Sequence, residues 1–257
     1  MLILLPPSEG KAARGTSATR RLSFPELDSP REKVLDALVA LCRTETAQAV
    51  LGLSAGQAGE IARNRELAAA RALPVAELYT GVLYDHLGLA TLSPAARRRA
   101  DRRIVVFSGL WGLLRPADRV PPYRLSMGVR LPPMGGLTAF WRPAITAALE
   151  PAKGLVVDLR SATYAAAWQP GERSVAVRVL REAAGTRTVV SHMAKATRGV
   201  VARALVETPE RPRTAQELAE VLTGLLGGLP GGHGHRVELG GRPRRGGSWT
   251  LDVIVEE

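Results

Sequence analysis

The residues MLILLPPSEGK at positions 1–11 decide the fold class of this chain. Leu2–Leu5 is a continuous apolar run, which is typical of a buried strand, and the two prolines that follow end it. The polar turn at residues 8–11 comes directly after that strand. Open α/β sheets place ligand-binding groups at the carboxyl ends of their strands. The beginning of the chain therefore predicts a buried strand followed by a candidate binding loop that contains Lys11.

Further apolar runs at residues 104–107 and 154–159 predict buried strands of the same kind. Residues 175–181 and 186–190 predict two paired strands, and 235–239 with 248–255 predicts a closing hairpin. Segments with a helical pattern of apolar residues lie between them: 33–43, 47–72 with a break near 52–54, 76–89, 95–103, 139–149, 164–168, 194–206 and 214–226. No repeat or linker divides the chain. We expect one α/β domain over residues 1–257, with a mixed sheet surrounded by helices.

Composition excludes several classes of protein. The chain has 257 residues, of which 46% are hydrophobic, and this is enough for a substantial core. No apolar run reaches the roughly 18 residues of a membrane span, and the apolar start is too short for a signal peptide. The single cysteine, Cys42, provides neither a disulfide nor a cysteine zinc site, and the four histidines lack metal-ligand spacing. We predict a soluble cytoplasmic monomer with no metal and no other cofactor.

The charge favours an anionic partner. Net charge is +11, and a bias of this size is typical of proteins that bind nucleic acid. The alternative is a genome-wide preference for arginine, because only four basic residues are lysines. Lys11 and Lys195 are two of these four, and both fall in segments that resemble motifs. A lysine retained against such a background indicates a need for a compact ammonium group.

The stretch at residues 108–133 is rich in Gly, Pro and Arg and is too long for an idle connection. Ser108 and the glycines near it predict a backbone nest for an anion. Arg115 and Arg124 supply bidentate donors for phosphate, and Tyr123 can stack on a base. The alternative is a rigid structural loop.

A second candidate site is the segment SHMAKATRG at residues 191–199. If a helix begins there, its N-terminus favours an anion, and Lys195 and Arg198 share one face. The alternative is a solvated helix face. Residues 51–61 have the spacing of a helix-hairpin-helix, with Gly52 in place and Ser54 where a second glycine is expected. An ordinary helical hairpin is the alternative there.

Polar residues that follow several strands also suggest catalysis. Asp158 ends the run at 154–159, and Tyr164 follows it closely. Proton transfer or a Schiff base needs such groups to converge, whereas binding DNA does not. In this hypothesis a desolvated Lys195 is the nucleophile and Asp158 or Tyr164 the acid or base. Ser108 is a weaker nucleophile candidate, since no nucleophile-elbow motif surrounds it.

Several segments together resemble the YaaA family of bacterial peroxide-stress proteins. They are MLILLPPSEGK (1–11), YTG (79–81), SGLWGLLRP (108–116), PYRLSMG (122–128), FW (140–141), DLRSATY (158–164) and SHMAKATRG (191–199). The resemblance implies an α/β fold with a positively charged cleft, a helix-hairpin-helix at residues 52–61 and binding to double-stranded DNA. It also implies which residues line the cleft: Lys11, Arg115, Tyr123, Arg124, Tyr164, Lys195 and Arg198.

Two hypotheses about function follow. The first is a double-stranded DNA-binding protein that limits DNA damage during peroxide stress. The alternative is an enzyme, a lyase or hydrolase, that acts on a nucleotide, a nucleobase or a damaged DNA base. A single pocket the size of a nucleotide would favour the enzyme, and a long open groove would favour duplex DNA.

Overall fold

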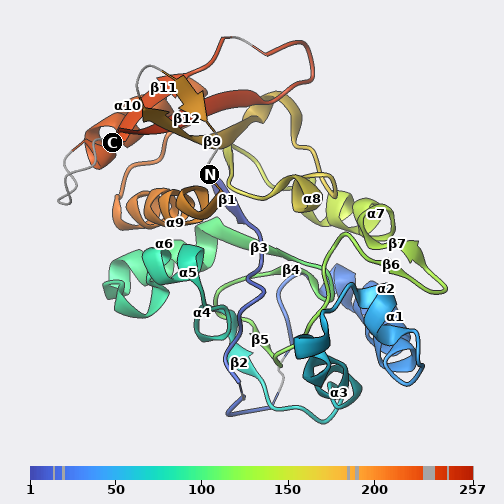
Figure 1. The fold of residues 1–257 in the computed structure, drawn as a ribbon. Helices are drawn as coiled ribbons and strands as arrows, with labels where there is room; N and C mark the ends of the chain where they lie inside the picture. The colour runs from blue at the N-terminus through green and yellow to red at the C-terminus, as the bar shows by residue number, and fades with distance from the viewer. Residues whose placement is uncertain are drawn as a thin grey trace.

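A computed structural model describes residues 1–13, 15–18, 21–183, 186–188, 191–227, 235–241 and 243–256. Within these residues, one mixed sheet has the strand order β11-β12-β9-β8-β1-β3-β4, and β10 pairs with β9 (Figure 1). Its strands are β1 (Leu2–Leu5), β3 (Ile104–Ser108), β4 (Gly112–Leu114), β8 (Val156–Asp158), β9 (Ser174–Ala183), β10 (Thr186–Thr188), β11 (His235–Leu239) and β12 (Trp249–Glu256). The predicted mixed α/β fold is confirmed.

Strand β1 lies between two parallel neighbours. Ile3 is in register with Ile104 of β3 on one side and with Val157 of β8 on the other. Every residue of β1 and β3 is buried. Strands covered on both faces contain continuous apolar runs, which is why the sequence predicted them correctly. Strand β8 is shorter than the predicted run, since it contains only Val156–Asp158.

The second half of the sheet contains a pairing that the sequence pattern did not indicate. The predicted hairpin of β11 and β12 forms. Its longer strand, β12, also pairs in parallel with β9, from Trp249 opposite Val175 to Glu256 opposite Glu182. The predicted pairing of β9 with β10 is confirmed for Thr186–Thr188, while positions 189–190 lie outside the described residues.

Helices cover both faces of the sheet. Figure 1 shows α5, α6 and α9 on one side and α7 and α8 on the other. The helices of four or more residues are α1 (Asp28–Leu41), α2 (Ala47–Leu51), α3 (Gly59–Arg65), α4 (Val75–Leu78), α5 (Val82–Leu87), α6 (Pro94–Arg103), α7 (Leu137–Leu149), α8 (Ala162–Ala165), α9 (Ser191–Glu207) and α10 (Ala215–Leu226). The helix predicted at 76–89 is divided into α4 and α5, because Gly81 between them has φ 97°. None of the described helices has the length and apolarity needed to cross a membrane.

The basic helix α6 holds the end of α9 in place. Arg103 donates to the carbonyl of Leu205 at 2.6 Å, and Arg99 donates to that of Val206 at 2.7 Å. The last carbonyls of a helix lack partners within the helix, so these arginines satisfy them. Two of the arginines of this basic helix therefore fix the position of α9.

The long segment at 108–133 is mostly internal. It contains β4 and the short strands β5 (Arg119–Val120) and β6 (Arg130–Leu131), which pair with β2 (Leu73–Pro74) and β7 (Gly135–Gly136). Arg31 of α1 is buried beneath it and donates to the carbonyls of Trp111 at 3.0 Å and Leu113 at 2.8 Å. The segment belongs to a hydrophobic core that extends from Leu2 to Val253.

Candidate functional site

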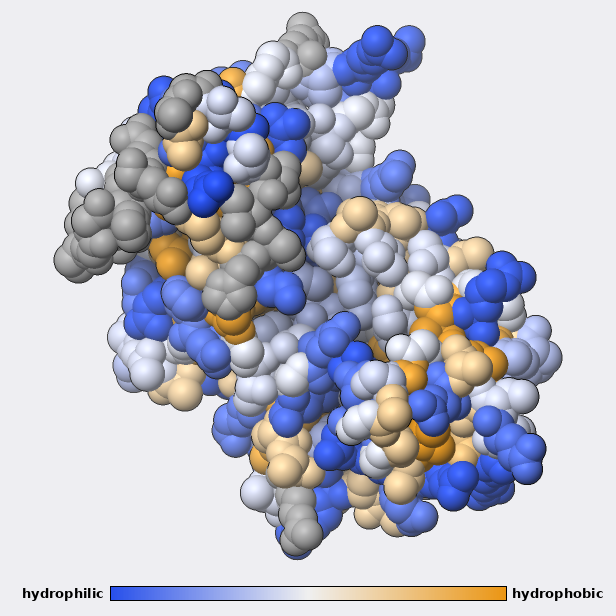
Figure 2. Space-filling view, viewed as in Figure 1, coloured by the Kyte–Doolittle hydropathy of each residue, from blue (hydrophilic) through white to orange (hydrophobic). Residues whose placement is uncertain are grey.

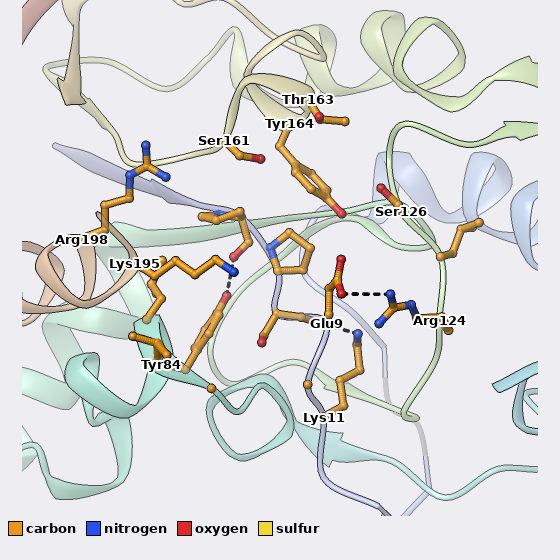
Figure 3. A pocket seen from close by; sticks show the side chains of 18 residues that line it. Glu9, Lys11, Tyr84, Arg124, Ser126, Ser161, Thr163, Tyr164, Lys195 and Arg198 are labelled. Carbon is orange, nitrogen blue, oxygen red and sulfur yellow. Dashed lines mark hydrogen bonds and ion pairs between the residues drawn. The ribbon is translucent and has the colours of Figure 1, made fainter. Parts of the chain in front are cut away.

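A pocket of about 500 Å³ lies at the carboxyl end of β1. The loop after β1, residues 6–11, forms one wall, and residues 161–164 after β8 form another. Residues 81–84 at the start of α5, residues 124–126 beyond β3 and the first turns of α9 complete it. Figure 2 shows hydrophilic side chains around a hollow on this face, and Figure 3 shows the pocket closely. Strand β1 has β3 as its neighbour on one side and β8 on the other, so the order of the strands reverses at β1. Open α/β sheets bind ligands at such a switch point.

Positive charge is concentrated in the pocket. Its lining includes the basic side chains Lys11, Arg124, Lys195 and Arg198, and among the described residues Glu9 provides the one carboxylate. A guanidinium nitrogen of Arg124 lies 3.0 Å from Glu9, whose side chain is 81% exposed. Such an exposed pair stabilises little and leaves Arg124 able to bind another anion. The described part of the chain offers no hydrogen-bond partner to the buried Nε of Arg198, and burial lowers the pKa of Arg198.

Lys11 is held in an unusual environment for a lysine. Its Nζ donates to the carbonyl of Ser8 at 2.7 Å and lies 4.5 Å from the centre of the Tyr123 ring. The pKa of Lys11 is lowered to about 7, mainly by burial and next by the charge of the neighbouring Arg124, while Glu60 and Glu9 act in the opposite direction. At neutral pH a large fraction of this side chain is therefore an uncharged amine.

A buried chain of hydroxyls lies beneath Lys11. The hydroxyl of Tyr123 lies 2.6 Å from that of Ser108 and 2.8 Å from that of Tyr79. Ser108 Oγ also accepts from the backbone amides of Leu110 at 3.2 Å and Trp111 at 3.0 Å. The Ser108 hydroxyl therefore occupies amides that the predicted anion nest would have used. Ser108 and Tyr123 form the support of the pocket and are not among the residues that line it.

Asp158 and Tyr164 have different surroundings. The Asp158 carboxylate accepts hydrogen bonds from the guanidinium of Arg160 at 2.8 Å and 2.6 Å and from its backbone amide at 3.0 Å. The centre of that guanidinium lies 4.2 Å from the centre of the Phe107 ring. The Asp158 carboxylate is thus engaged by a buried partner and lies outside the pocket lining. Tyr164 does line the pocket, and burial raises the pKa of its hydroxyl.

Arg115 and the hairpin residues lie outside the pocket lining. Arg115 donates to the carbonyls of Arg102 at 2.9 Å and Ile104 at 3.0 Å. Gly52 ends α2 with φ 64°, and Ser54 forms a capping box with Gln57. The amide of Gly52 donates to a carbonyl of α2, and that of Ser54 donates to the Gln57 side chain. Those two amides would have to exchange partners to bind a phosphate, and the DNA contact of this hairpin stays a prediction.

The predicted site residues thus fall into two groups. Five line the pocket together, namely Lys11, Arg124, Tyr164, Lys195 and Arg198. The desolvation that we expected at Lys195 is found at Lys11 instead, since Lys195 is exposed. Sequence reasoning missed the pocket residue Tyr84, which donates to the carbonyl of Pro6 at 2.8 Å and closes one wall. It also missed Ser126 and Thr163, although these polar residues stand inside the quoted motifs.

The pKa of Lys11 makes stability depend on pH. Between pH 7 and 10, the unfolded chain holds a proton on Lys11 that the folded chain has released, so the free energy of unfolding should rise with pH. Replacing Lys11 by methionine removes this dependence. We expect Lys11→Met to be more stable than the parent at pH 6, with an advantage that shrinks by pH 10, as measured by urea unfolding. Lys33→Met, on the exposed surface of α1, should show no such trend.

The chain is similar to known proteins over a range that includes every segment of the pocket. The family model described as peroxide stress protein YaaA matches residues 1–224. A UPF0246 protein of Streptomyces coelicolor is 52% identical over 268 residues, covering 100% of this chain and 99% of its own length. UPF0246 proteins of Corynebacterium efficiens and Corynebacterium glutamicum are 42% and 38% identical, over 87% and 86% of this chain and 92% and 91% of theirs.

Proposed function

This chain belongs to the family of the peroxide stress protein YaaA, and from that premise we propose that it acts in the response to peroxide by binding a phosphate-bearing ligand, a nucleotide or a nucleotide unit of DNA, in the pocket at the end of β1. The observation that carries the proposal is the convergence of Lys11, Arg124, Lys195 and Arg198 on one pocket. Its volume of about 500 Å³ is within the usual range for small-molecule sites.

The phosphate would bind on the side of α9. Lys195 and Arg198 lie in the first two turns of this helix, one turn apart. The helix N-terminus adds a partial positive charge there, and this favours an anion. The hydroxyls of Ser126, Ser161 and Tyr164 and the apolar Val82 and Leu125 line other parts of the pocket. The hydroxyls can form hydrogen bonds with the polar edge of a sugar or a base, and the apolar side chains can pack against its flat face.

A comparison of ligands with and without phosphate tests this proposal. The four 2′-deoxynucleoside 5′-monophosphates should bind at least 100-fold more tightly than the matching nucleosides, because charge-assisted hydrogen bonds are the strongest that the pocket offers. Isothermal titration calorimetry at two salt concentrations measures the difference. Equal affinity for the two sets of ligands would contradict phosphate recognition.

Double-stranded DNA is the second candidate partner, and the net charge of +11 favours it. The same titration can be run with a short duplex. Duplex binding that nucleotides fail to displace would place the DNA contact outside the pocket, on another basic surface. Displacement by mononucleotides would indicate that DNA presents one nucleotide to the pocket. An enzyme acting on that nucleotide then becomes the favoured interpretation.

A further inference from the structure

The two pocket lysines differ in a way that suggests different chemistry. Lys195 is exposed on α9 and extends toward the pocket beside Arg198 (Figure 3). Lys11 enters from the loop after β1 and is partly buried against Tyr79 and Tyr123. An exposed ammonium group suits an anion, whereas a desolvated amine suits a carbonyl carbon.

Resting on the proposed function, we propose that Lys11 is a nucleophile that forms an imine with an aldehyde or ketone carrying a phosphate group. The phosphate would be held by Lys195 and Arg198, and the carbonyl would face Lys11. The substrate class is therefore a small phosphorylated sugar in its open-chain form, free or at a damaged position of DNA.

The contacts of Lys11 leave its amine available. It makes one hydrogen bond, to the carbonyl of Ser8, and among the described residues it makes no ion pair. The acids nearest to it in electrostatic effect, Glu60 and Glu9, are themselves paired with Arg63 at 2.6 Å and Arg124 at 3.0 Å. Both carboxylates still raise the pKa of Lys11, but burial is the largest influence and keeps that pKa lowered to about 7.

The aromatic floor fixes the position of the amine. Tyr123 and Tyr79 are fully or nearly buried and are joined by the hydrogen bond between their hydroxyls. The Lys11 Nζ lies 4.5 Å from the centre of the Tyr123 ring and 5.4 Å from that of Tyr79, and Lys11 lines the pocket. A rigid floor of this kind holds a nucleophile in place without competing for its lone pair.

The reaction is balanced without a further reagent. The Lys11 nitrogen attacks the carbonyl carbon, and the nitrogen proton moves to the oxygen to give a carbinolamine. The carbon–oxygen bond then breaks, and the hydroxyl leaves as water with a proton from solvent. The second nitrogen proton is released when the neutral imine forms, so one amine and one carbonyl give one imine and one water.

At neutral pH the lowered pKa of Lys11 leaves more of its amine uncharged, and so able to attack a carbonyl, than is the case for an ordinary lysine. An amine with a pKa of about 7 is about half uncharged at pH 7. An ordinary lysine with a pKa near 10.4 is uncharged in only about one molecule in 2,500. The reactive form is thus about a thousandfold more abundant at Lys11 than at an ordinary lysine.

Reductive trapping tests the proposal on the full chain. Pyridoxal 5′-phosphate is a small aldehyde with a phosphate group, and borohydride converts its imine into a stable amine that peptide mass spectrometry can locate. The chain has four lysines and the α-amine of Met1, so peptide mass spectrometry can assign each adduct to one of these amines. At pH 7 we expect at least tenfold more adduct on Lys11 than on Lys33 or Lys153. Pyridoxal without phosphate should give at least tenfold less.

Variants distinguish the role of each lysine. Lys11→Arg should lose the pocket adduct while keeping the circular dichroism spectrum and the cooperative urea unfolding of the parent, which show that the variant is folded. The control Lys33→Arg should be labelled at Lys11 like the parent. The yield at Lys11 should fall as the pH decreases below about 7, since the amine becomes protonated.

The negative outcomes of these experiments distinguish a failure of the imine proposal from a failure of the proposed function. An adduct on Lys195 in place of Lys11, or no adduct although the aldehyde displaces a bound nucleotide, would overturn the imine proposal and leave the phosphate site intact. If neither nucleotides nor pyridoxal 5′-phosphate bind at all, the proposed function itself fails.

Discussion

Replacing Lys195 and Arg198 together by methionine should weaken the binding of a deoxynucleoside monophosphate by about 100-fold or more. Both residues line the pocket on the side of α9. A hydrogen bond to a charged group contributes about 1.5–3 kcal/mol, so two lost contacts correspond to about 3–6 kcal/mol. Every 1.4 kcal/mol is about tenfold in affinity. Calorimetric titration of the variant and the parent measures the loss.

The matched control is Lys33→Met, which removes one positive charge from the exposed surface of α1. It should change the affinity by less than about twofold, because a distant surface charge is screened by salt. If the double variant bound the nucleotide as tightly as the parent, the phosphate would not lie against α9. A comparable loss in the control would indicate that overall charge, and not the pocket, attracts the ligand.

Replacing Gly199 by alanine should destabilise the protein by about 3 kcal/mol and weaken ligand binding as well. A Cβ at Gly199 would lie 2.3 Å from the carbonyl oxygen of Leu83 and 2.8 Å from the Cβ of His86. Backbone atoms of α5 cannot rotate away as a side chain can, so α9 must move. Overpacking of this kind typically costs about 1–3 kcal/mol, and occasionally more. The shift would displace Lys195 and Arg198 from Tyr84, on the facing helix.

Gly224→Ala provides the control for that substitution. Gly224 lies within helix α10, and a Cβ there would meet no atom within 4 Å. Alanine favours a helix over glycine by about 0.8–1 kcal/mol, so this variant should be slightly more stable. Urea unfolding of both variants measures the free energy of unfolding, which should fall in Gly199→Ala and rise slightly in Gly224→Ala. A stable Gly199→Ala would mean that α5 and α9 can separate without cost.

The sequence predicted the parts of the fold and site that depend on local pattern. Strands β1 and β3 are covered on both faces, so their apolar runs were readable without any knowledge of their neighbours. Lys11 and the pair Lys195 and Arg198 stood out because loops after strands and helix N-termini are defined by short motifs. Their convergence on one pocket depends on the order of the strands, which no local pattern contains.

Other candidates shared the chemistry of the site without sharing its position. Arg115 and Arg124 come from the same loop, yet the first binds internal carbonyls and the second lines the pocket. Asp158 ends β8 and Glu9 follows β1, but only Asp158 is paired with a fully buried arginine, Arg160. An arginine aimed at a carbonyl has the same sequence signature as one aimed at a phosphate. The parallel pairing of β12 with β9 was invisible for a related reason, since 74 residues separate Trp249 from Val175.

The pocket is assembled from segments that extend from Pro6 to Arg198, and no two neighbouring walls come from one continuous stretch of chain. An unfolded chain therefore has no such site, and any ligand that occupies it binds only the native state. Linkage then requires occupancy to raise the free energy of unfolding, by about 2.7 kcal/mol when the free ligand is at a hundred times its dissociation constant. Amide hydrogens throughout β1, β3 and β8 would exchange more slowly as the ligand accumulates. The lifetime of the protein in the cell would thus follow the supply of its own ligand.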